Sequence, residues 1–290
     1  MTWKKKMAGA APTRLRAVTC SALAVVALAG PASAQCSFSV PGSVLVQPTS
    51  HGLFYGDSIT VGILGTPYHY ALLVRHMLAA AYCDFELFDV DAIGQRGSHY
   101  LRYARRIGRD LTASEFPFDW VMFQDSGRAL KLAYERDPDS PRSFPIAVQQ
   151  TIDEARAVEP SITVFLATTP PLDHANATAS WEVRYDRVND FDDHNDALEE
   201  LAGEGGHPVV TWATDVCRAY AEAPDAEWTR DGVHPQPFGE VLFALSILRS
   251  FGVPRADLKL DDLAQFHVSL DPTTVSTIAD WVYAPNPACD

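Results

Sequence analysis

The stretch HGLFYGDSIT, residues His51 to Thr60, carries the main clue to the fold of this chain. Its apolar run from Leu53 to Gly56 indicates a buried strand, and a glycine-punctuated segment then leads towards a helical pattern. Ser58 lies at this junction, and two roles are open to it. A serine at a helix start commonly accepts a backbone hydrogen bond as a cap, whereas a serine with a base nearby can act as a nucleophile.

The alternation of strand-like and helix-like runs continues along the chain. Because parallel strands are joined by crossover helices, this order predicts an α/β fold: a three-layer α/β/α sandwich with a five-stranded parallel sheet. Ligands of such sheets bind beyond the carboxyl ends of the strands, which is where Ser58 falls. The five predicted strands are Leu53–Gly56, Phe85–Val90, Asp119–Gln124, Ile162–Thr169 and Pro208–Ala213.

The first 34 residues have the features of a secretory signal peptide. Five basic residues accompany an apolar run, Ala22 to Ala29, and Ala32-Ser33-Ala34 offers a cleavage site. The apolar run is too short to span a bilayer, and the residues before Cys36 do not suit lipid attachment, so we expect no stable membrane anchor. We expect residues 1–34 to be removed and residues 35–290, from about Gln35, to be secreted or periplasmic.

The chain is strongly acidic. Its formal net charge is −14, and loss of the five basic residues of the signal peptide would take it to about −19. Nucleic acids and anionic membranes both demand a basic surface, so neither is an expected partner. The charge favours solubility and leaves the oligomeric state open.

Four cysteines would remain after cleavage: Cys36, Cys83, Cys217 and Cys289. An even number in an oxidising compartment predicts two disulfides, for which three pairings exist; four free thiols are the alternative. We favour Cys36 with Cys83 and Cys217 with Cys289. Cys83 precedes the second predicted strand at the end of the sheet away from Ser58, where an N-terminal tail can return. The wide cysteine spacing does not match a zinc site.

A motif near the other end of the chain supplies the partners that a nucleophilic serine needs. In RDGVHPQPFGEVLFA, Asp231 stands three residues before His234, ahead of the last long helical pattern. From one loop, the carboxylate can accept the Nδ1 proton of the imidazole while Nε2 faces Ser58 and takes its hydroxyl proton. Taken alone, such a pair can also simply cap the following helix.

The segments GDSIT and DGVHP, with the trailing Phe238-Gly239, together resemble the first and last blocks of the SGNH, or GDSL-type, hydrolases. The resemblance covers roughly Leu53 to Gly252. It implies a flavodoxin-like fold and a serine esterase or lipase that needs no cofactor. It also implies a catalytic triad in which Ser58 is the nucleophile, His234 the general base and acid, and Asp231 the carboxylate that orients the histidine.

The resemblance further implies an oxyanion hole made by the N–H of Ser58, a glycine N–H after strand two and an asparagine side chain after strand three. Gly97, in DAIGQRGSHY, matches the glycine. The asparagine is missing, because the segment after strand three reads FQDSGRAL, and Arg128 near its position is the predicted third donor. The alternatives are Gly94 for the glycine, and Gln124, Ser126 and the Gly127 N–H for the third donor.

These features predict one SGNH hydrolase domain over residues 35–290, with an extension at residues 253–290 to which we assign no function. The expected activity is hydrolysis of carboxylic esters, of small molecules or carbohydrates, through an acyl-enzyme on Ser58. An acyltransferase or a carbohydrate O-acetyl esterase would use the same triad. A non-catalytic binding protein on the SGNH scaffold is the alternative from another class.

Other polar and aromatic clusters offer weaker candidates. The acidic run Asp192–Asp196 lies in a helical pattern, and Asp173-His174 lacks the spacing of a metal site, so no metal is expected. One residue of the aromatic trio Tyr68, His69 and Tyr70 can line the pocket, although packing in the core explains Tyr70 equally well.

Overall fold

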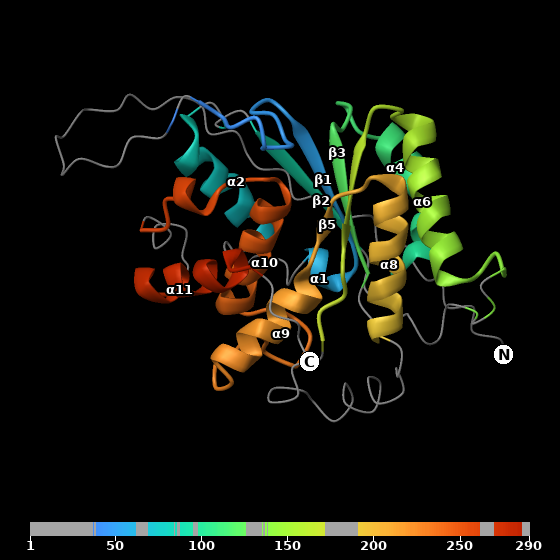
Figure 1. Cartoon of the computed structure of the whole chain (residues 1–290). Helices are drawn as coiled ribbons and strands as arrows, with labels where there is room; N and C mark the ends of the chain where they lie inside the picture. Colours follow the sequence, from blue (N-terminus) through green and yellow to red (C-terminus); the bar gives the residue numbers. More distant parts are fainter. Residues whose placement is uncertain are drawn as a thin grey trace, which may run out of the picture.

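A five-stranded parallel β-sheet forms the centre of the protein in the computed structural model (Figure 1). The strands lie in the order β2-β1-β3-β4-β5, and each neighbouring pair is parallel. This is the strand order of flavodoxin-like folds, so the predicted architecture is confirmed. The strands are β1 (His51–Gly56), β2 (Asp89–Gly94), β3 (Trp120–Gln124), β4 (Thr163–Ala167) and β5 (Val209–Val210). The structure describes residues 37, 39–61, 69–83, 85, 88–94, 98–125, 135, 137, 139–171, 191–261 and 270–285.

Side chains of the strands alternate between two hydrophobic cores, one on each face of the sheet. In β1, Phe54 belongs to one core, whereas Leu53 and Tyr55 belong to the other. Strands β3 and β4 divide their residues in the same way. Because successive strand residues point to opposite faces, a strand covered on both faces is apolar throughout, which explains the short apolar runs of the sequence.

Helices cover both faces of the sheet (Figure 1). In α2, the buried residues Leu73, Val74, Met77, Leu78 and Ala81 recur at intervals of three and four, which places them on one face of the helix. Among the described residues, none of the helices combines the length and apolarity needed to cross a membrane. One core includes residues of α2 (Tyr70–Ala81), α9 (Trp212–Glu222), α10 (Pro237–Ser250) and α11 (Pro272–Tyr283), and the other includes residues of α3 (Tyr100–Tyr103), α4 (Ile107–Thr112), α6 (Phe144–Val158) and α8 (Phe191–Gly205).

The second strand differs from the prediction. It is Asp89–Gly94 rather than Phe85–Val90, because Phe85 and Phe88 are buried core side chains that precede the strand. β2 forms an edge of the sheet, where its polar residues stay partly exposed, so it lacks the apolar run of the inner strands.

Two other segments also differ from their sequence patterns. The helix-like run over residues 98–111 forms two short helices, α3 and α4, instead of one. Helix α9 begins at Trp212, inside the predicted fifth strand, which leaves only Val209–Val210 as β5. The apolar side chain of Trp212 is buried, as the pattern indicated, but in a helix rather than in a strand.

The position of the candidate site follows from the topology. The order in which strands are added reverses between β1 and β3, and ligands of doubly wound sheets bind outside the carboxyl ends of the strands at such a point. Ser58 follows β1 after a single residue and is the first residue of the short helix α1, Ser58–Val61.

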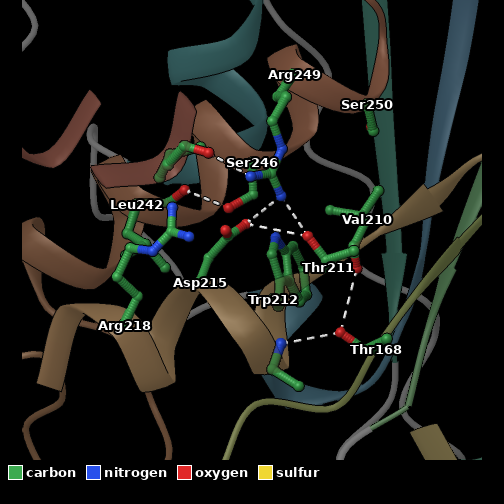
Figure 2. A network of polar contacts seen from close by, with 12 residues as sticks. Thr168, Val210, Thr211, Trp212, Asp215, Arg218, Leu242, Ser246, Arg249 and Ser250 are labelled. Atoms are coloured by element: carbon green, nitrogen blue, oxygen red, sulfur yellow. Dashed lines mark hydrogen bonds and ion pairs between the residues drawn. The ribbon is translucent and has the colours of Figure 1, made fainter. Parts of the chain in front are cut away.

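Two arginines attach helix α11, which lies within the predicted C-terminal extension, to α9 and α10. Arg249 of α10 forms an ion pair with Asp215 of α9, with 2.8 Å between Nη2 and Oδ2, and also donates to the Thr211 hydroxyl (Figure 2). The guanidinium groups of Arg249 and Arg218 donate to backbone carbonyls at the carboxyl end of α11. The last carbonyls of a helix lack intrahelical partners and carry partial negative charge, so cations are favourable there.

Candidate active site

The segment around Ser58 begins with a carboxylate that takes the capping role. Asp57 is fully buried, and its Oδ1 accepts a hydrogen bond of 2.8 Å from the backbone N–H of Ile59. An aspartate in this position satisfies one of the donors that the first helical turn leaves unpaired. Asp57, and not Ser58, is therefore the cap of α1, and the Ser58 hydroxyl can form a hydrogen bond with another side chain.

Asp231 shapes a tight loop that presents His234. Its Oδ1 accepts hydrogen bonds from the backbone N–H groups of Val233 and His234, at 3.2 and 2.9 Å. Gly232 has a φ of 92°, which favours glycine, and its N–H donates to Thr229 Oγ1 at 2.9 Å. The spacing in DGVH thus lets one carboxylate bind both the backbone and the ring of the histidine.

A chain of hydrogen bonds joins Ser58, His234 and Asp231. Ser58 Oγ lies 3.0 Å from His234 Nε2, and His234 Nδ1 lies 2.8 Å from Asp231 Oδ2. Because Nδ1 donates to the carboxylate, Nε2 is free to accept the proton of the serine hydroxyl. The fold therefore brings together the three residues that the sequence predicts as a triad, although Ser58 and His234 are 176 positions apart.

The environment of Asp231 keeps this carboxylate ionised. Partial burial opposes its charge, but hydrogen bonds from the backbone and ring of His234 outweigh the burial and lower the pKa of Asp231. An ionised carboxylate can stabilise an imidazolium that forms beside it. The stability that this group gives the folded state is present above its usual pKa and is lost as the pH falls through the lowered pKa.

The loop that carries His234 is fixed to the start of α10. The backbone N–H of Gln236 donates to the carbonyl of Trp228 at 2.9 Å, which closes the loop. A Cβ at Gly239 would lie 2.4 Å from the same Trp228 carbonyl oxygen, so only glycine permits this approach of helix and loop. Gly239 in the PQPFG segment therefore has a packing role behind the histidine.

Residues at the carboxyl ends of β1 and β3 pack against α1. Thr60 Oγ1 donates to Gln124 Oε1 at 2.9 Å, and both side chains are fully buried. A Cβ at Gly56 would lie 2.0 Å from Thr60 Oγ1 and 2.9 Å from the Gln124 backbone oxygen, so no space is left between the two strands and α1. The Gln124 amide nitrogen has no hydrogen-bond partner among the described residues. Gln124, an alternative for the third oxyanion donor, is thus placed beneath α1 and away from solvent.

Most predicted oxyanion residues lie outside the part of the chain that the structure describes. Gly94, the alternative to Gly97, is the last residue of β2 and pairs with Gly56 of β1. Gly94 therefore lies at the carboxyl end of β2, beside the carboxyl end of β1 that leads to Ser58. The residues outside the described ranges are Gly97, Ser126, Gly127 and Arg128.

An asparagine that the sequence did not single out stabilises the carboxyl edge of the sheet. The Asn195 side chain, from α8, accepts a hydrogen bond from Thr169 N at 2.8 Å and donates to Thr169 O at 3.2 Å, as a neighbouring strand would. Thr169 Oγ1 in turn donates to the carbonyl of Asp125 after β3, at 2.9 Å. Asn195 belongs to the polar run over residues 192–196, and within the described ranges no group of three or more potential metal ligands occurs.

The structure describes two of the three aromatic residues after α1, and both are buried. Tyr68 lies outside the described residues, whereas Tyr70 is fully buried against Phe54 and Trp212, so core packing accounts for it. The ring of His69 lies against that of Tyr70, with centroids 4.4 Å apart, and is also buried.

Comparison with known proteins identifies the family and the fold. The chain matches the model of the GDSL-like lipase/acylhydrolase family over residues 54–241, and no curated protein sequence matches it. A solved structure assigned as a GDSL-like lipase from Parabacteroides merdae is 18% identical, with a TM-score of 0.59 over 73% of this chain and 99% of that chain. A catalytic mutant of Axe2, an acetylxylan esterase from Geobacillus stearothermophilus, is 20% identical, with a TM-score of 0.54 over 74% and 99%. At these identities the two structures show a shared fold.

The close packing at Gly56 predicts that Gly56→Ala lowers kcat. The added methyl group must displace Thr60 and with it the helix that carries Ser58, and a small misplacement of reacting groups can cost about a hundredfold in rate. We expect kcat on p-nitrophenyl acetate to fall about tenfold to a hundredfold, with stability reduced by about 1–3 kcal/mol. Gly42→Ala is the matched control, because a Cβ there meets nothing within 4 Å. Equal kcat values for the two variants would contradict the proposed packing constraint.

Proposed function

The chain belongs to the GDSL-like lipase/acylhydrolase family, and from that premise we propose that it is a secreted serine esterase in which Ser58, His234 and Asp231 form the catalytic triad. As a member of this family it is an esterase-type hydrolase that acts on ester bonds. The observation that carries the residue assignment is the continuous hydrogen-bond chain from Ser58 Oγ through His234 to Asp231.

In the proposed mechanism, Ser58 Oγ attacks the ester carbonyl carbon while His234 Nε2 takes the hydroxyl proton. The tetrahedral intermediate collapses as the bond from carbon to the alcohol oxygen breaks, and His234 gives its proton to the leaving alcohol. A water molecule then attacks the acyl-enzyme, with His234 again taking the proton. The second tetrahedral intermediate collapses as the bond from the acyl carbon to Ser58 Oγ breaks, His234 gives its proton back to Oγ, and the carboxylic acid is released. Asp231 stabilises the imidazolium in both halves of the reaction.

Charge on the carbonyl oxygen must also be stabilised. We assign this to the backbone N–H groups of Ser58 and Gly97 and to the side chain of Arg128, which has several fixed donors. The burial of Gln124 favours Arg128 over Gln124, because a donor to the oxyanion has to reach the substrate. Loss of one such donor typically reduces kcat by about a hundredfold to a thousandfold.

The acyl group that we propose is acetyl, carried on a carbohydrate. Axe2, which shares the fold, is an acetylxylan esterase, and an acidic exported enzyme suits a soluble carbohydrate outside the cell. Activity should therefore be highest on p-nitrophenyl acetate and fall as the acyl chain lengthens, and acetate should be released from acetylated xylo-oligosaccharides. Preference for long acyl chains would indicate a lipase-like enzyme instead.

Triad variants test the residue assignment. Ser58→Ala and His234→Ala should each lose nearly all ester hydrolysis, and Asp231→Asn should lose less, because the carboxylate orients and stabilises the base without reacting. Hydrolysis of p-nitrophenyl acetate gives kcat, and circular dichroism checks that each variant folds. More than a few per cent of wild-type kcat in folded Ser58→Ala would refute the assignment of the nucleophile.

We further propose export of residues 35–290 and two disulfides, Cys36 with Cys83 and Cys217 with Cys289. Cys83 and Cys217 are both disulfide-bonded in the structure. Ser37, next to Cys36, exchanges backbone hydrogen bonds with Ala81 and Cys83, and Arg218, next to Cys217, donates to the carbonyl of Pro285. These contacts, at Ser37 and at Pro285, support the proposed pairing.

Peptide mapping of the exported protein tests the pairing. We expect two disulfide-linked peptide pairs without reduction, each adding about 2–4 kcal/mol of stability by restricting the unfolded chain. The mature N-terminus should lie near Gln35. Free thiols, or a peptide that links Cys83 to Cys217, would contradict the proposal.

A further inference from the structure

His69 connects the helix that carries Ser58 to the helix that follows it. The residue is only 9% exposed, and its Nε2 lies 3.4 Å from the carbonyl oxygen of Ile59 in α1. Its Nδ1 accepts a hydrogen bond of 3.3 Å from the backbone N–H of Ala71, which makes His69 the N-cap of α2. The two ring nitrogens therefore bind two different helices.

These contacts fix the tautomer of His69. Nδ1 has to accept from an N–H group, and Nε2 has to donate to a carbonyl, so the proton is on Nε2. Burial lowers the pKa of His69 to about 4, which keeps the ring neutral at neutral pH. A protonated ring could no longer accept the hydrogen bond from Ala71.

Contacts with α10, β1 and α9 hold the amino end of α2 in place. The carboxylate of Glu240, buried in α10, accepts a hydrogen bond of 2.6 Å from the backbone N–H of Tyr70. The Tyr70 side chain is packed edge-on against Phe54 of β1 and Trp212 of α9. Because α10 begins directly after the loop that carries His234, the amino end of α2 is fixed to the helix that follows this loop.

Helix α1 is held by the Ile59 side chain, which is buried in the core on the α2 side, and by hydrogen bonds from three polar side chains. It contains only four residues, so its carbonyl groups have few partners inside the helix. Asp57 holds its amino end, Thr60 binds Gln124 below it, and His69 holds the carbonyl of Ile59, the residue after Ser58. Of these three side chains, that of His69 comes from the N-cap of α2.

We propose that His69 is a positioning residue, which sets the place of the Ser58 hydroxyl relative to His234 by binding the backbone of α1 to the amino end of α2. In this role it acts through the backbone of α1 and not on the substrate or the reacting atoms. The proposal rests on the proposed function of Ser58 as nucleophile and adds the group that holds this nucleophile in place.

Two substitutions separate this role from simple capping of α2. Asparagine is a good N-cap and can keep the hydrogen bond to Ala71, but its short side chain cannot reach the carbonyl of Ile59. Glutamine places an N–H donor near the position of the histidine Nε2 and can keep the contact with α1. His69→Asn should therefore fold but misplace Ser58, and His69→Gln should restore its position.

The experiment measures kcat and KM for p-nitrophenyl acetate, the rate at which an organophosphonate labels the serine, and the melting temperature. We expect His69→Asn to lose about tenfold to a hundredfold in kcat and in labelling rate, with KM within about threefold of wild type. His69→Gln should recover most of this loss at a similar melting temperature. His76→Asn, elsewhere on α2, is the control for loss of a histidine and should keep the wild-type kcat.

Two results would overturn the role of His69: a kcat within twofold of wild type in folded His69→Asn, or a His69→Gln no faster than His69→Asn. Ser58→Ala, measured alongside, separates this from failure of the proposed function. If Ser58→Ala retains activity, the nucleophile is wrong and with it the premise of the proposal. If Ser58→Ala is inactive and the His69 variants are fully active, only the positioning role is wrong.

Discussion

The hydrogen bond of 3.0 Å between Ser58 Oγ and His234 Nε2 joins two segments that lie 176 positions apart in the sequence. β1 pairs with β2 and β3 to place Ser58 at the carboxyl edge of the sheet, and α10 packs on α2 to hold the loop that carries His234. Neither segment can form this contact alone. The active-site geometry therefore depends on the pairing of β1 with β2 and β3 and on the core on the α2 side.

Each end of that hydrogen bond is prepared by an aspartate that binds nearby backbone. Asp57 caps α1, which frees the Ser58 hydroxyl for the imidazole. Asp231 uses one oxygen to fold its own loop and the other to hold the His234 ring. Both carboxylates act within three residues of their own position, so the long-range step in assembling the triad is the placement of α1 against the loop of His234.

Short motifs could be predicted well because their roles are local. The pattern of Asp231 and His234 encodes a loop that binds itself, and the apolar runs of β1 and β3 encode strands buried on both faces. The sequence predicts the wrong bounds for the edge strand β2, because a half-exposed strand tolerates polar residues and its apolar pattern is therefore weak. Two long-range roles could not be read from the sequence, because each depends on which helix lies beside which strand: Gln124 beneath α1, and Asn195 beside Thr169.

Rapid acid quenching of the reaction with p-nitrophenyl acetate, followed by mass spectrometry of the peptides, tests the central claim most directly. An acyl-enzyme on the serine at the end of β1 predicts one acetyl group per chain on the hydroxyl of Ser58, formed in step with a burst of p-nitrophenolate. An acetyl group on a different residue, or steady turnover with Ser58 unmodified at every quench time, would contradict the account.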